Sequence, residues 1–215
     1  IKDLKKIGEK LRKGELQDYS FGDLEIFQFN HHIYQPLIHV RKGAVGLSIK
    51  PASFNKHEKQ FINDLKAWCE KEAEGELKGR ELYVLRNQSR GKGISFFDEG
   101  NFYPDFIIWL IDGDRQYITF ADPHGLQHAR SFSDSKVLFS KRIKEIETER
   151  LADDTVTLNA FILSPTLYSS IAHWDEKADR ERFDDHHIMF MYDDAETYIE
   201  RMFEMMLGGT VAVDD

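Results

Sequence analysis

Apolar residues recur along the chain at two spacings, which predict helices in some segments and strands in others. The clearest helix spans residues 57–72, where Phe61, Ile62, Leu65 and Trp68 form one apolar stripe. The same reasoning predicts helices over residues 3–13, 136–149 and 195–207, and strands over residues 81–85, 155–163 and 188–192. Two further strands around a tight turn are expected in residues 103–121. This order predicts an α/β fold in which helices flank a mixed central sheet.

The first fifty residues carry a separate pattern. Residues 26–29 and 37–40 are short strand-like runs with a polar turn containing Pro36 between them. We expect residues 1–50 to add a helix and strands to a core over residues 51–215 that ends in an acidic strand and helix. With 215 residues, of which 41% are hydrophobic, the chain has the size of one elaborated domain.

The most informative segment for chemistry is the predicted hairpin. Residues 106–111 are continuously apolar, and the tetrapeptide Asp-Gly-Asp-Arg that follows is typical of a tight turn. If Gly113 and Asp114 form its centre, residues whose numbers sum to 227 lie opposite one another, and Asp105 pairs with Asp122. Directly opposed residues have Cβ atoms roughly 4.5 to 5.5 Å apart. Two carboxylates at that separation repel each other, and a bound Mg²⁺ or Mn²⁺ would relieve the repulsion. A bulge would shift this register.

Two further side chains are candidates for the same site. His124 lies two residues beyond Asp122, on the same side of an extended chain, where an imidazole could orient or deprotonate a water. The alternative is a polar strand end that enters a Pro-Gly turn. Glu58 lies on the apolar side of the helix over residues 57–72, but Asn55 and Glu58 also have the spacing of a capping box. Spacing alone leaves both interpretations of Glu58 open.

Charge is unevenly distributed along the chain. The net charge of −9 resides in residues 175–215, which hold 13 acidic and 4 basic residues, so residues 1–174 are balanced. We expect this acidic tail to face away from any bound nucleic acid. Residues 77–95 are basic, and Arg86, Arg90 and Lys92 are candidates for phosphate contacts. A solvated turn and strand would have the same composition.

The composition and the motifs exclude several kinds of site and bear on the cellular compartment. Cys69 is the only cysteine, which excludes an intramolecular disulfide and fits a cytoplasmic protein. The sequence has no phosphate-binding GxxxxGK[ST] loop and no GxSxG elbow, so a motor ATPase would be on another segment or partner. We expect surface histidines, not a metal site, at His31, His32, His186 and His187. No apolar run is long enough to span a membrane, and because Ile1 stands where Met is expected, we expect a piece of a longer polypeptide.

The order of these motifs resembles a known nuclease arrangement. Glu58 is followed by Leu85-Arg86-Asn87, Gly93-Ile94-Ser95-Phe96-Phe97, Pro104-Asp105-Phe106 and Asp122-Pro123-His124-Gly125. Over roughly residues 50–130 the chain resembles the C-terminal nuclease region of type III restriction-type DEAD/DEAH-box helicases, a branch of the PD-(D/E)XK class. Pro104-Asp105 matches the PD element, and Asp122-Pro123-His124 matches (D/E)XK with histidine in place of lysine.

The resemblance implies a restriction-endonuclease-like core that hydrolyses DNA with Mg²⁺ or Mn²⁺, as part of or partner to a helicase in restriction or antiviral defence. Asp105 and Asp122 would hold the metal with the Pro123 carbonyl and Glu58. His124 would act either as a neutral base, with activity rising with pH through its titration, or as a cation, with activity falling. A DNA-binding or docking domain that has lost catalysis is the alternative function.

Overall fold

The computed structural model describes residues 19–21, 24–27, 31–32, 37–40, 53–87, 103–126, 129, 131–151, 153–171, 174 and 178–208. The predicted helix over residues 3–13 and the glycine-rich stretch with Arg90 and Lys92 lie outside these ranges. None of the helices within them combines the length and hydropathy that a membrane-spanning segment needs.

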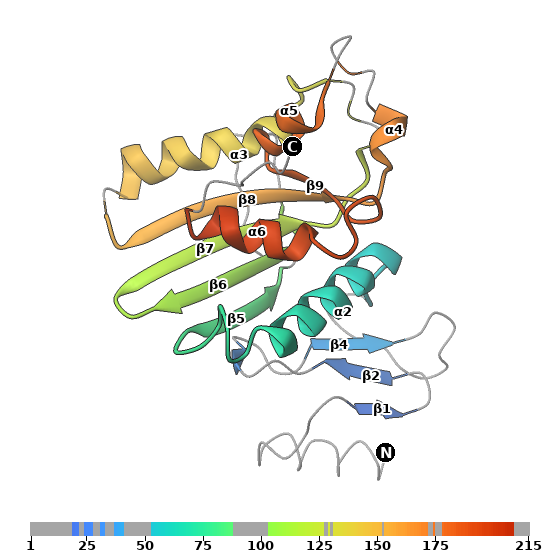
Figure 1. Ribbon diagram of the computed structural model, residues 1–215, viewed down its shortest axis with the longest axis vertical. Coiled ribbons are helices and arrows are strands. Elements are labelled where there is room, and N and C mark those ends of the chain that lie inside the picture. The colour runs from blue at the N-terminus through green and yellow to red at the C-terminus, as the bar shows by residue number, and fades with distance from the viewer. Residues whose placement is uncertain are drawn as a thin grey trace.

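A six-stranded mixed sheet forms the centre of the molecule (Figure 1). Its strands, in spatial order, are β3 (His31–His32), β5 (Glu81–Arg86), β6 (Phe106–Asp112), β7 (Arg115–Asp122), β8 (Val156–Ser164) and β9 (Ile188–Phe190). Strand β6 is antiparallel to both β5 and β7, whereas β7, β8 and β9 are mutually parallel. Strands β5, β7, β8 and β9 therefore all end at one edge of the sheet. The α/β fold with a mixed sheet flanked by helices is confirmed.

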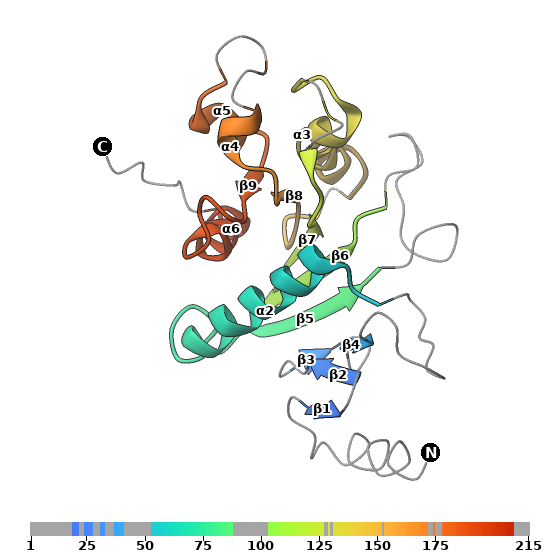
Figure 2. The ribbon, with the colours of Figure 1, turned by 90° about the vertical axis from the view of Figure 1, so that its right-hand side faces the viewer.

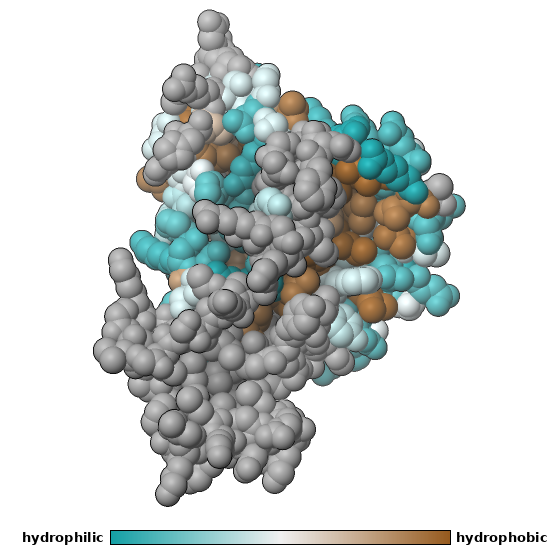
Figure 3. All heavy atoms as spheres, turned by 180° about the vertical axis from the view of Figure 1, so that it is seen from behind, coloured by the Kyte–Doolittle hydropathy of each residue, from teal (hydrophilic) through white to brown (hydrophobic). Residues whose placement is uncertain are grey.

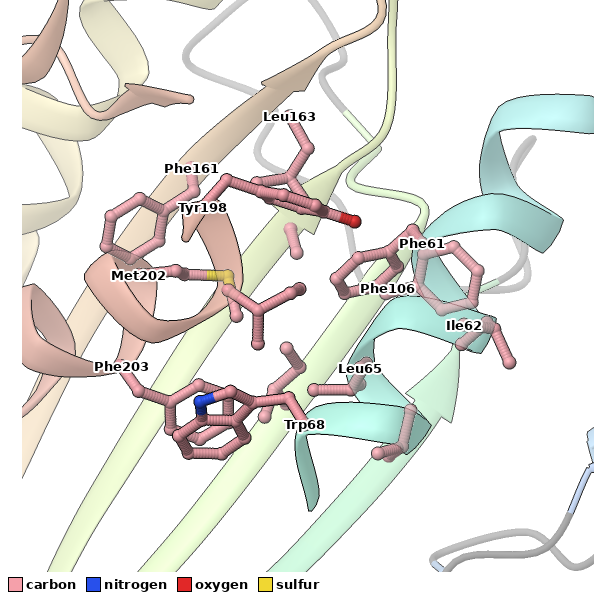
Figure 4. Packing of buried hydrophobic residues seen from close by; sticks show 14 of the residues in the cluster. Phe61, Ile62, Leu65, Trp68, Phe106, Phe161, Leu163, Tyr198, Met202 and Phe203 are labelled. Atoms are coloured by element: carbon pink, nitrogen blue, oxygen red, sulfur yellow. The ribbon is translucent and has the colours of Figure 1, made fainter. Parts of the chain in front are cut away.

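One face of the sheet is covered by α2 (Lys56–Lys71) and α6 (Tyr198–Met206). Trp68 of α2 stacks on Phe203 of α6 with ring centroids 3.9 Å apart (Figure 4). Alternate residues of β6, such as Phe106 and Ile108, point into this core and are 0% exposed. A strand covered on both faces explains why residues 106–111 are continuously apolar.

The other face is covered by α3 (Ser135–Ile146), which continues as a π-helical turn, η3 (Glu147–Leu151). Phe139 and Ile143 of α3 pack on Phe120 of β7 and on β8. Figure 3 shows apolar atoms at the surface on this side of the molecule. The hydrophobic residues that pack against the α3 cluster but remain partly open are Leu85, Ile118, Ile146 and Val156. Two short helices, α4 (Tyr168–Ile171) and α5 (Arg180–Asp184), lie between β8 and β9.

The N-terminal region forms a second, three-stranded sheet of β1 (Tyr19–Phe21), β2 (Leu24–Phe27) and β4 (Leu37–Val40), which lies near α2 and β5 (Figure 2). Both predicted strands are present and pair antiparallel, the first over residues 24–27 in place of 26–29, while β1 was not predicted. Residues 31–32 also join the large sheet beside β5. This strand was not predicted, because two residues are too few to show an alternating pattern. Glu25 of β2 pairs with Lys59 of α2 at 2.5 Å, which ties the small sheet to the core.

The expectation of surface histidines is wrong for two positions. His186 is 7% exposed, and its Nδ1 lies 2.8 Å from the Arg182 carbonyl oxygen. The His187 ring stacks on Phe161 with centroids 4.7 Å apart, and its Nδ1 lies 3.1 Å from the Ala160 carbonyl oxygen. Burial lowers the pKa of His187 to about 4. His186 therefore packs against α5, and His187 packs against β8.

This burial predicts acid sensitivity. Because the folded protein takes up a proton on His187 less readily than the unfolded chain, the free energy of unfolding should fall as pH drops from about 6.5 to about 4, by about 3 kcal/mol in total. Asparagine tolerates the positive φ of 53° at this position, so His187→Asn should flatten that slope. Urea unfolding across this pH range measures it, and equal slopes in both proteins would contradict the assignment.

Candidate functional site

The edge at which β7 ends brings the two predicted acids together. The observed register pairs Asp112 with Arg115 and Phe106 with Ala121, which is the predicted sum of 227. Asp105 and Asp122 occupy the next position, and their side chains are hydrogen-bonded to each other. The Asp105 carbonyl accepts from the Asn87 N–H at 2.8 Å, which fixes this position to the end of β5.

The two carboxylates repel each other when both are charged. Burial raises the pKa of Asp105 to about 8, aided by the charge and hydrogen bond of Asp122 and by the charge of Glu58, against a smaller opposing effect of Lys136. Asp122 is only 3% exposed, so water does little to screen the repulsion. The raised pKa favours a proton shared by the two carboxylates at neutral pH, and a bound cation would offset the same repulsion.

A lysine that the sequence analysis did not select completes this arrangement. The Lys136 ammonium contacts the Asp122 carboxylate from the first turn of α3, whose N-cap is Asp134. A cation in the first turn opposes the helix dipole, typically by about 0.3 to 1 kcal/mol. The ion pair with Asp122 offsets that cost. The sequence feature that could have identified Lys136 is a lysine in the first turn of a helix, where acidic residues are more usual.

Glu58 serves the fold in two ways. Its Oε2 accepts from the Asn55 N–H at 2.5 Å while the Asn55 side chain accepts from the Glu58 N–H at 2.9 Å, which is the capping box. The same Oε2 accepts from Arg86 Nη2 at 2.9 Å. Glu58 lies close enough to Asp105 to raise its pKa, yet its carboxylate is already bonded to these two donors. Both donors contact the same oxygen, Oε2, so the predicted role of Glu58 as a metal ligand stays a prediction.

Arg86 faces the protein interior. Its guanidinium also lies 4.4 Å from the centre of the Phe54 ring and 3.4 Å from the Ser53 carbonyl oxygen. The Arg86 side chain is 11% exposed and that of Glu58 is 9% exposed. This geometry gives Arg86 a positioning role at the end of β5, in place of the open phosphate contact that the sequence suggested.

A substitution tests whether the ion pair of Arg86 and Glu58 stabilises the fold. Arg86→Ala leaves Glu58 buried without its cation, so the free energy of unfolding should fall by about 3 kcal/mol. The double variant Arg86→Met with Glu58→Gln should recover part of this loss, because neither buried charge remains. Chemical denaturation measures both effects. If Arg86→Ala were as stable as the wild type, the buried pair would not support the site.

The segment beyond Asp122 differs from the extended chain assumed in the sequence analysis. The His124 N–H donates to the Asp122 carbonyl at 2.8 Å, so the chain turns at Pro123. Pro123 is buried and His124 is exposed. Strand alternation therefore does not place the His124 imidazole on the side of Asp122, although His124 remains next to the acid pair in the chain.

The donor set fits one kind of metal. Within the described ranges, no group of three or more His, Cys, Asp or Glu side chains is arranged to hold an ion. Mg²⁺ and, by similar chemistry, Mn²⁺ are commonly held by one or two carboxylates, with waters and substrate phosphates completing the shell. Asp105 and Asp122, with the Pro123 carbonyl, fit such an open site and do not fit a closed structural metal site.

Comparison with known proteins adds no relative: no protein-family model, curated protein or solved structure matches the chain. The resemblance to the type III nuclease region thus rests on the quoted motifs.

Proposed function

We propose that this chain is a divalent-metal-dependent endodeoxyribonuclease domain with a restriction-endonuclease-like core. The observation that carries the proposal is the contact between Asp105 and Asp122 at the ends of adjacent strands, with Lys136 on Asp122. Support for DNA as the substrate comes from the motif resemblance. Without a phosphate-binding loop in its sequence, the domain would depend on a helicase segment or subunit for any ATP-driven movement.

Asp105, Asp122 and the Pro123 carbonyl would hold Mg²⁺ or Mn²⁺. The ion supplies charge stabilisation at the phosphate and a more acidic bound water. Binding it requires Asp105 to give up the proton that the raised pKa retains at neutral pH.

Lys136 would take the role that the lysine has in the (D/E)XK element. Histidine stands at the third position of the (D/E)XK element, and the ammonium group reaches Asp122 from α3 instead. An ammonium group is a cation with N–H donors and no acceptor, so beside Asp122 it would attract a phosphate oxygen. Lys136 is 25% exposed at its side chain, which leaves it open to a substrate. We propose that it fixes the orientation of Asp122 and stabilises charge that develops on the phosphate.

The test is cleavage of plasmid and single-stranded DNA by the purified protein, with Mg²⁺, with Mn²⁺ and with chelator. The proposal expects metal-dependent cleavage that disappears in an Asp105→Asn protein purified in parallel. Equal cleavage by both proteins under all conditions would reject the nuclease and leave the non-cleaving DNA-binding domain as the better account.

A further inference from the structure

Tyr192 is an exposed aromatic residue held in place by a distant segment. It follows β9 and is 40% exposed. Its hydroxyl lies 3.2 Å from Nδ1 of His57, a residue separated from it by 135 positions, and the two rings meet edge to face at 6.1 Å. Lys56 Nζ lies 5.8 Å from the Tyr192 ring centre. A single exposed aromatic is ordinary, but one fixed by His57 and Lys56 has a defined orientation.

The three residues lie on the same edge of the sheet as the acid pair. Strand β9 is parallel to β7 and is two positions away from it, about 10 Å at the usual strand spacing. His57 precedes Glu58, which bonds Arg86 at the end of β5. Figure 1 shows the segment after β9 near the start of α2. A DNA strand bound at Asp105 and Asp122 would therefore extend towards Tyr192.

The charge at this edge favours an anion. Lys56 is exposed in the first turn of α2, where it adds to the positive end of the helix dipole. Lys136, which is partly buried in the first turn of α3, pairs with Asp122 of the acid pair. The acids next to Tyr192 are paired: Arg180 binds Asp194 at 2.6 Å, and Asp193 Oδ2 accepts from the Tyr168 N–H at 3.0 Å. The prediction that the acidic tail faces away from bound nucleic acid concerns its charged residues, and it stays a prediction.

We propose that Tyr192, Lys56 and His57 form a platform for an unpaired nucleotide next to the candidate site. The Tyr192 ring would stack on a base and Lys56 would contact a phosphate, while His57 positions the ring. Every base has a stacking face, so such a platform is tolerant of sequence and favours single strands. The inference rests on the proposed nuclease function, and it adds a preference for a single-stranded region beside the cleaved bond.

Binding of a fluorescein-labelled oligothymidylate and of a blunt duplex, both with Ca²⁺ in place of Mg²⁺, tests the platform. We expect Tyr192→Leu to weaken oligothymidylate binding about tenfold and to leave duplex binding unchanged, whereas Tyr192→Phe keeps the ring and most of the affinity. Tyr83→Leu, a change of the same kind in the middle of β5, is the matched control. Lys56→Ala should reduce the salt dependence of binding by about one ion, and Lys78→Ala should not.

Thermal unfolding establishes that each variant is folded. Equal oligothymidylate affinity of the wild type and Tyr192→Leu would overturn the platform, as would an absence of oligothymidylate binding by the wild type. Cleavage by the wild type in Mg²⁺ is measured separately. Tyr192-dependent binding without cleavage would reject the nuclease and keep the platform, whereas cleavage with Tyr192-independent binding would reject the platform alone.

Discussion

Replacing Asp105 with asparagine should eliminate metal-dependent cleavage and, at the same time, make the metal-free protein more stable. The amide has the shape of the protonated acid and can keep a hydrogen bond to Asp122, but it carries no charge to repel that carboxylate. A lost metal ligand removes several kcal/mol of transition-state stabilisation, so the rate should fall by roughly 10³-fold or more. Thermal unfolding in chelator should give a higher midpoint for the variant, as expected where a site trades stability for function.

The matched control is Asp114→Asn, at the exposed turn of the same hairpin, which should change neither property. Added Mg²⁺ should raise the midpoint of the wild type and of Asp114→Asn, but not that of Asp105→Asn. A variant that is less stable than the wild type in chelator would show that the carboxylate pair is a structural feature of the hairpin.

Replacing Lys136 with methionine should have the opposite effect on stability while also reducing cleavage. Methionine keeps much of the volume of lysine but leaves Asp122 buried without its cation, so the metal-free protein should become less stable. Loss of one charged donor at a developing oxyanion typically costs roughly 10²- to 10³-fold in rate. Single-turnover cleavage with saturating metal measures this loss apart from metal affinity.

Lys141→Met, an exposed change on the same helix, is the control for Lys136→Met. Lys136→Arg should retain part of the rate, because it keeps the charge with a different geometry. The comparison with His124→Ala decides between the two residues that can take the lysine position of the motif. Full activity of Lys136→Met together with loss of activity in His124→Ala would assign that position to His124.

The acid pair could be predicted from sequence because one local feature fixes it. An Asp-Gly-Asp-Arg turn between two apolar runs sets the hairpin register, and Gly113 has the positive φ of 59° that such a turn favours. Once the turn is placed, Asp105 and Asp122 must lie opposite each other. The capping box of Asn55 and Glu58 was visible for the same reason, since its residues are three positions apart.

Lys136 could not be found in this way, because its contact depends on where α3 starts relative to the end of β7. No periodicity in residues 123–135 specifies that return of the chain to the strand end. His124 was misplaced by a related failure. The expectation of an extended chain did not allow for the hydrogen bond between its N–H and the Asp122 carbonyl, which turns the backbone at Pro123.

Buried polar contacts explain the remaining differences. Arg86 lies in a basic stretch of sequence, but its ion pair with Glu58 and its contact with Phe54 draw it inward. His187 follows three polar residues and still packs against Phe161. In both cases a partner far away in the sequence determines whether the side chain is buried, and the local composition does not indicate that partner.

The central claim is that Asp105 and Asp122 together hold a divalent cation, and calorimetric titration with Mn²⁺ tests it without requiring a substrate. We expect the wild-type protein to bind a single cation and to release protons as it does so, and we expect Asp105→Asn to lose this binding while Asp114→Asn retains it. Binding of Mn²⁺ by Asp105→Asn with the affinity of the wild type, or no binding by the wild type, would contradict it.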